Sequence, residues 1–217
     1  MAEVYPPEVE GESLSWIDIW IKALTQPSEE SYVEIINDPQ ASSKKANTWV
    51  FLAAFVAFVI SILFGAVFST DLYGGIGGLG FGWIFGTMIC AGPVSGVFAV
   101  LGLIISSGII QAIAKALGGE GEREQLVFVM AAYVAPISLI STFIGSIPYV
   151  SILGWVVSIY AFVLNVIAVK ATNKFSWGKA IASSLGILLL IGVIAVAVIV
   201  ILALIGPAIG NIYKNLQ

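Results

Sequence analysis

Few side chains in this sequence have the chemistry of catalysis or metal binding. Among its 217 residues there is no histidine and a single cysteine, Cys90. That composition excludes a zinc site of histidine and cysteine ligands, haem ligation by histidine, a structural disulfide and the Ser-His-Asp and Cys-His catalytic sets. A net charge of −4 also lacks the positive excess that binding to a phosphate backbone requires. We therefore expect no metal ion, no cofactor and no nucleic-acid partner.

One glycine-rich stretch has the spacing of a nucleotide-binding motif. Gly75, Gly77 and Gly80 form a G-x-G-x-x-G pattern within residues 74–82. This pattern binds dinucleotides only where a strand precedes it and a helix follows it in a βαβ unit. Here it lies between two long apolar segments, so a flexible linker is the better interpretation.

The remaining candidates are uncharged polar side chains in apolar surroundings. They are Gln111, Asn165, Ser138, Ser141 and Thr142. The cores of the apolar segments contain no charged residue, so proton relays, ion-coupled transport and paired-carboxylate catalysis lack their usual residues. We favour hydrogen bonding between helices as the role of this set, with a pathway for a neutral solute as the alternative.

The segments that carry these side chains are long enough to cross a membrane. The chain is 59% hydrophobic and 10% charged, whereas a soluble domain has about 25% charged residues. Apolar stretches near the ~20 residues needed for one crossing lie at about 49–68, 93–116, 126–147, 150–169 and 180–204. We predict an all-α integral membrane protein, with five transmembrane helices in residues 49–209 and a short outer tail at 210–217.

Proline residues set two of these boundaries. Gly92-Pro93 is expected to break the apolar run that begins at Phe81, which leaves a half-helix or an interfacial segment before the second span. Gly206-Pro207 is expected to close the fifth span.

The basic residues predict the orientation of the spans. Eight of the nine Lys and Arg residues fall in the N-terminal segment and in alternate loops: Lys22, Lys44, Lys45, Lys115, Arg123, Lys170, Lys174 and Lys179. The loops at 71–82 and 146–150 contain none. Because basic residues concentrate on the cytoplasmic side, we expect a cytoplasmic N-terminus and a C-terminus outside.

The polar N-terminal segment divides into a tail and two short helices. Residues 1–12 are acidic and contain Pro6-Pro7, so we predict a disordered tail. Residues 13–48 are predicted as a cytoplasmic segment with helices at about 15–25 and 28–37.

The first of these helices carries a candidate contact face. It is expected to begin at the N-cap Ser15 and to end before Pro27. The face consists of Trp16, Ile17, Trp20, Ile21 and Leu24, the last four at i, i+3, i+4 and i+7. A helix on the membrane surface and a helix packed on other protein fit this pattern equally well.

Spaced proline, glycine and tyrosine residues resemble those of the Yip family, membrane proteins first known as interactors of Ypt/Rab GTPases. The matching positions include Pro27, Tyr133, Pro136, Pro148, Gly154, Tyr160 and Lys179. The resemblance covers roughly residues 20–205 and implies a five-span fold and partners among small GTPases. Short loops and the lack of an N-x-[S/T] sequon favour a prokaryotic member.

Two functional hypotheses follow. The first is a non-enzymatic multi-pass protein that organises the lipid bilayer or recruits partners through its N-terminal helix. The second is a channel or permease for a neutral or lipidic solute that uses Gln111 and Asn165. Small residues four apart, such as Gly92 and Gly96, also permit homo-oligomers.

Overall fold

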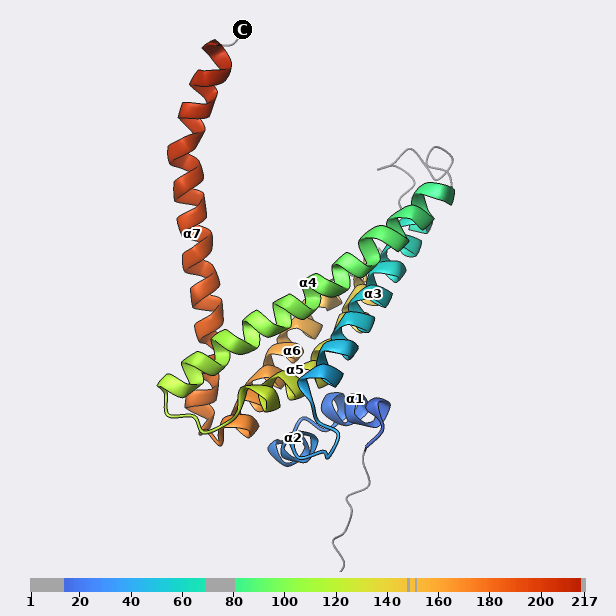
Figure 1. The fold of residues 1–217 in the computed structure, drawn as a ribbon, viewed down its shortest axis with the longest axis vertical. Helices are drawn as coiled ribbons and strands as arrows, with labels where there is room; N and C mark the ends of the chain where they lie inside the picture. Colours follow the sequence, from blue (N-terminus) through green and yellow to red (C-terminus); the bar gives the residue numbers. More distant parts are fainter. Residues whose placement is uncertain (1–13, 69–80, 148, 151, 216–217) are drawn as a thin grey trace, which may run out of the picture.

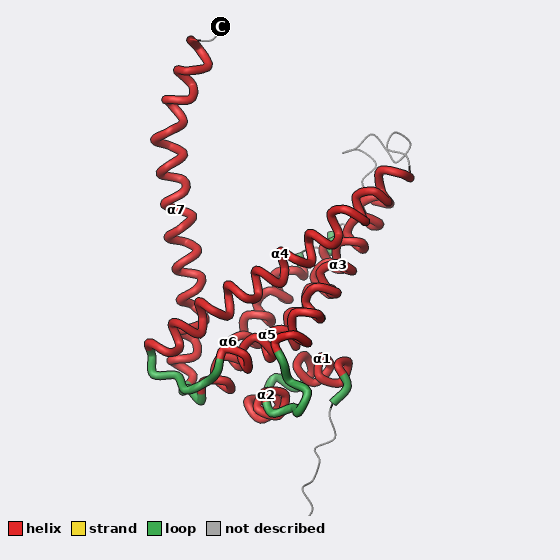
Figure 2. The backbone as a smooth tube through the Cα atoms, viewed as in Figure 1, coloured by secondary structure: helices red, strands yellow, loops and turns green. Residues whose placement is uncertain are grey.

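The computed structural model describes residues 14–68, 81–147, 149–150 and 152–215, and in these ranges all regular structure is helical (Figures 1 and 2). The helices are α1 (Trp16–Thr25), α2 (Glu29–Ile36), α3 (Ser43–Phe68), α4 (Phe81–Ala116), α5 (Arg123–Gly145), α6 (Leu153–Asn173) and α7 (Trp177–Asn215).

Helices α3 to α6 form a bundle around α5. Helix α3 lies along both α4 and α5, and α6 packs on the other side of α5. Nearly every residue of α5 from Leu126 to Pro136 is buried. Four of the described helices are long and apolar enough to cross a membrane, over Ser43–Gly65, Ile84–Ala116, Arg123–Gly145 and Leu153–Asn173. A helix suits this setting because it satisfies its backbone hydrogen bonds without water.

Helix α4 corrects one expectation. It is continuous from Phe81 to Ala116, with Pro93 inside it, so the predicted break and half-helix do not form. Packing on α3 explains the continuity: a Cβ atom at Gly92 would lie 2.7 Å from a ring carbon of Phe55, and one at Gly96 would lie 2.6 Å from Phe51. These close approaches hold both halves of α4 against one neighbour, where a proline is tolerated.

Helix α7 corrects a second boundary. It continues to Asn215, beyond Gly206-Pro207, where we expected the fifth span to end, and it includes most of the predicted outer tail. In an apolar setting a helix remains the best way to pair backbone groups, so the proline need not end it. Only the first turns of α7 pack on α4 and α6, after which α7 diverges from the bundle (Figure 1).

The two short helices lie at one end of the bundle. Helix α1 packs on α5, and α2 packs on both α5 and α6. The C-terminal end of α7 lies at the opposite end of the molecule (Figure 1). Alternation of the long helices brings the basic residues Lys44, Lys115, Arg123, Lys170 and Lys179 to the end that holds α1 and α2.

Candidate functional site

Helix α1 is capped as predicted and is fixed to the bundle by one face. The hydroxyl oxygen of Ser15 accepts a hydrogen bond from the backbone N–H of Asp18. Ile19 and Ala23 are fully buried in the core that α1 shares with α2 and α5. Burial of these side chains supplies the apolar contact that a ten-residue helix needs, because so short a helix is unstable alone.

The face that docks on the bundle differs from the candidate contact face for a membrane or a partner, which stays a prediction. Ile17 and Ile21 are 50% and 54% exposed, and Trp16 is 47% exposed. Trp20 and Leu24 are partly buried against the core. We define the exposed face of α1 as Trp16, Ile17 and Ile21. The helix is apolar on two sides, since one side docks on the bundle while the other remains uncovered.

Helix α2 docks through a buried tyrosine. The Tyr32 side chain is fully buried, and its hydroxyl group donates a hydrogen bond to the carbonyl oxygen of Ala23 at 3.1 Å. Burial raises the pKa of the Tyr32 phenol, and the nearby phenols of Tyr133 and Tyr160 raise it further. The phenol therefore stays neutral and keeps its role as a donor, which ties α1 to α2.

Polar contacts join both short helices to α6. The hydroxyl group of Tyr160 donates a hydrogen bond to the carbonyl oxygen of Leu24 at the end of α1. Lys170 forms an ion pair with Glu29 in the first turn of α2. Tyr160 was selected from the sequence as a family position. Its partner in the N-terminal segment is the carbonyl oxygen of Leu24.

A chain of aromatic rings runs from α1 into the bundle. The ring centroids of Trp16 and Trp20 are 5.0 Å apart, those of Trp20 and Trp49 are 6.1 Å apart, and those of Trp49 and Phe128 are 5.2 Å apart. Trp49 lies in the second turn of α3 and Phe128 in the second turn of α5. The exposed face of α1 is therefore next to the beginning of two helices long enough to span a membrane.

Gln111 belongs to a separate buried hydrogen-bond network. Its side-chain amide donates to the carbonyl oxygen of Gly121 at 2.6 Å and to Oδ1 of Asn173 at 3.1 Å. Asn173 in turn donates to Oε1 of Gln111 at 3.3 Å and to the carbonyl oxygen of Val169 at 3.2 Å. The network fastens α4 and the α4–α5 loop to the end of α6.

The structure does not bring Gln111 and Asn165 together as a polar pathway. Asn165 lies on α6 with a buried Oδ1 atom that has no hydrogen-bond partner among the described residues. Gln111 pairs instead with Asn173, one of the buried residues at the end of the same helix.

The other residues selected from the sequence are dispersed. Tyr133 and Pro136 are buried in α5, and Gly154 lies in the first turn of α6 with open space around it. Pro27 is exposed between α1 and α2, and the Lys179 amine donates to the carbonyl oxygen of Leu117 at 2.9 Å. Pro148, predicted in the turn before α6, lies outside the described residues.

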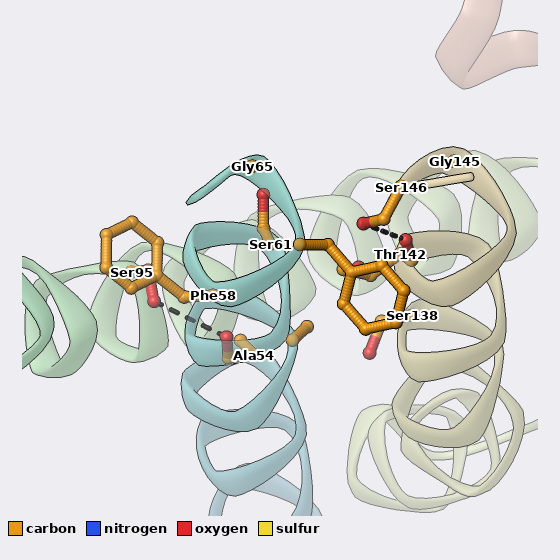
Figure 3. Close-up of a pocket in the computed structure, with 11 residues that line it drawn as sticks. Ala54, Phe58, Ser61, Gly65, Ser95, Ser138, Thr142, Gly145 and Ser146 are labelled. Atoms are coloured by element: carbon orange, nitrogen blue, oxygen red, sulfur yellow. Dashed lines mark hydrogen bonds between the residues drawn. The ribbon is translucent and has the colours of Figure 1, made fainter. Parts of the chain in front are cut away.

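A groove of about 680 Å³ lies at the other end of the bundle, between α3, α4 and α5. Figure 3 shows hydroxyl groups along it, contributed by Ser61, Ser95, Ser138, Thr142 and Ser146. The sequence identified Ser138 and Thr142 as buried polar residues, but it did not place them beside Ser61 or Ser95. No periodic pattern connects positions on three separate helices.

Sequence reasoning also missed the residues that dock α1 and α2. Ile19, Ala23 and Tyr32 were not part of the predicted contact face. The i, i+4 spacing of Ile19 and Ala23 is a signal of a second apolar face, and it was visible beside the stripe that includes Ile17 and Ile21.

No group of three or more His, Cys, Asp or Glu side chains is placed to hold a metal ion within the described ranges. In comparisons with known proteins, the family described as Yip1 domain matches residues 22–206. No curated protein and no solved structure matches the chain. The family match includes only the last four residues of α1, but it covers all of α2 and the four candidate spans.

Proposed function

The chain belongs to the Yip1 domain family, and from this premise we propose that it is a non-enzymatic multi-pass membrane protein that organises the bilayer through the exposed face of α1. The observation that carries the proposal is that α1 is apolar on two sides but packs on the bundle with only one of them. Ile19 and Ala23 hold the helix to the bundle, while Trp16, Ile17 and Ile21 remain half exposed near the beginning of α3 and α5.

Insertion of this face into the headgroup boundary follows from its chemistry. Tryptophan and isoleucine favour the boundary between headgroups and acyl chains, and a helix fixed beside the spans enters it without a further loss of freedom. The exposed face of α1 lies at one end of the bundle (Figure 1) and so enters only one leaflet. Its insertion expands that leaflet relative to the other. Such an imbalance is what favours a curved bilayer.

The proposed orientation places α1 and α2 in the cytoplasm. Lys44, Lys115, Arg123, Lys170 and Lys179 lie at the same end of the bundle as these helices, which agrees with the positive-inside rule. We propose that α7 is a fifth span, because its apolar length exceeds one crossing, and that the C-terminus is outside.

The alternative roles have less support. Recruitment of a small GTPase partner is compatible with the same exposed face and remains a proposal. A permease role for Gln111 and Asn165 is disfavoured, because Gln111 already uses its amide in bonds to Gly121 and Asn173.

Replacing Trp16, Ile17 and Ile21 together by serine is the direct test of the organising role. We expect the full-length protein, labelled and reconstituted in vesicles of mixed diameter, to be enriched in small vesicles, and the triple-serine variant to lose that enrichment. The loss is expected because serine removes the apolar surface that enters one leaflet.

The matched control retains apolar side chains at the same positions. Trp16→Phe, Ile17→Leu and Ile21→Leu together should keep the enrichment in small vesicles. Equal distributions of the wild-type and triple-serine proteins over all vesicle diameters would show that the exposed face of α1 does not organise the bilayer.

A further inference from the structure

We propose that the groove between α3, α4 and α5 binds a glycerolipid without net charge, whose ester carbonyl oxygens accept hydrogen bonds from Ser61 and Thr142. This inference goes beyond the proposed function, because the groove and the exposed face of α1 lie at different ends of the bundle.

The position of the groove determines what surrounds it. All of its lining residues except Ser146 come from the stretches Ser43–Gly65, Ile84–Ala116 and Arg123–Gly145, each of which is long and apolar enough to cross a membrane. The groove is open rather than enclosed and lies between helices long enough to span a bilayer, so surrounding lipid has access to it. A lipid molecule therefore reaches this site without leaving the membrane.

The hydroxyl groups of Ser95 and Ser138 in the groove already have partners. Ser95 donates to the carbonyl oxygen of Gly92 at 2.7 Å and approaches that of Ala54 at 3.5 Å (Figure 3). Ser138 donates to the carbonyl oxygen of Ala135 at 2.7 Å. With these groups satisfied, and with Phe58 beside them, this part of the groove suits an acyl chain.

Two hydroxyl groups nearer the ends of α3 and α5 have no such partner. Among the described residues, neither Ser61 Oγ nor Thr142 Oγ1 forms a hydrogen bond, although the backbone carbonyl of Thr142 accepts one from Ser146 at 2.7 Å (Figure 3). An unpaired hydroxyl group in apolar surroundings is unfavourable. An acceptor on a bound ligand would satisfy both groups.

Two properties of the groove indicate the polar part of the ligand: the position of its unpaired hydroxyl groups along the spans and the charge of its lining residues. Gly65 lies three residues before the end of α3 and Gly145 is the last residue of α5, so the unpaired hydroxyl groups are near the end of the spans. Ester carbonyl groups of glycerolipids occupy this level of a bilayer. None of the described residues that line the groove is charged, so none of them favours a headgroup with net charge.

Photolabelling in nanodiscs tests the proposal with the full-length protein. The nanodiscs consist of phosphatidylglycerol with a small fraction of phosphatidylcholine that carries a diazirine in one acyl chain. We expect saturable labelling of residues 54–65 and 138–146, and we expect unlabelled phosphatidylcholine to compete for it.

Glycine substitutions provide a matched pair of variants. A Cβ atom at Gly145 or at Gly102 meets nothing within 4 Å, but only Gly145 lines the groove. Gly145→Leu should therefore abolish the groove labelling, whereas Gly102→Leu should leave it unchanged. Thr142→Val removes the hydroxyl group and conserves the shape of the side chain, so it should reduce labelling without blocking the groove. Ser158→Ala, which lies outside the groove, should leave labelling unchanged.

Three results would overturn the proposal. They are labelling that does not saturate, labelling unchanged by both Gly145→Leu and Thr142→Val, and stronger labelling by a diazirine phosphatidylglycerol than by the phosphatidylcholine probe. Because α1 is intact in every variant, loss of groove labelling is distinguishable from loss of enrichment in small vesicles.

Discussion

Replacing Tyr32 by alanine is expected to release α1 and α2 from the bundle while the spans stay folded. The Tyr32 side chain is fully buried, and its hydroxyl group also holds the carbonyl oxygen of Ala23. Removal of a large buried ring lowers the free energy of unfolding by about 3–5 kcal/mol. The remaining contacts of two short helices are not expected to offset that loss. Hydrogen exchange of residues 14–42 in the full-length protein measures the release, as a loss of backbone protection.

Tyr32→Phe is the matched control for this prediction. It keeps the ring and removes only the hydrogen bond to Ala23, at a cost of about 1 kcal/mol. Protection of residues 14–42 should therefore remain close to that of the wild-type protein. If Tyr32→Ala also kept wild-type protection, the docking of α2 would not depend on this side chain.

Replacing Gly121 by alanine is expected to be the most damaging small substitution in the α4–α5 loop. A Cβ atom at this position would lie 2.3 Å from the carbonyl oxygen of Thr172 in α6, a backbone atom that cannot turn aside. The loop would have to move, which breaks the 2.6 Å hydrogen bond from Gln111 to the Gly121 carbonyl oxygen. The two effects together cost about 2–4 kcal/mol.

Thermal unfolding in detergent checks this prediction. Gly178→Ala is the control, because a Cβ atom in this first turn of α7 meets nothing within 4 Å. We expect a clear fall in the unfolding temperature for Gly121→Ala and little change for Gly178→Ala. Equal unfolding temperatures would mean that the loop is not packed against α6 as described.

The sequence predicted the helical class and the approximate positions of the long helices because apolar length is a local property. It did not predict how α4 passes Pro93, since the continuity depends on Phe51 and Phe55 of another helix. The expectation that a proline breaks a helix was therefore wrong here, because packing between helices keeps α4 continuous. The end of α7 beyond Pro207 shows the same limit.

The candidate site was predictable only in part for a related reason. The apolar character of α1 was evident, but two apolar faces overlap on this short helix, and the choice of Ile19 over Ile17 for the core depends on α5. The partner of Gln111 was likewise undetermined, because Asn173 is 62 residues away in sequence. Contacts of this range leave no periodic signal.

The depth of α1 in the bilayer tests the central claim most directly. In a Cys90→Ser background, a nitroxide label is attached in turn at Ile17→Cys, Ile21→Cys and, as an exposed control on α2, Glu30→Cys. Paramagnetic resonance of the full-length protein in bilayers then compares collisions with oxygen and with a water-soluble nickel complex. We predict that oxygen dominates at positions 17 and 21 and the nickel complex at position 30. Dominance of the nickel complex at all three positions would place the exposed face of α1 in water and contradict the account.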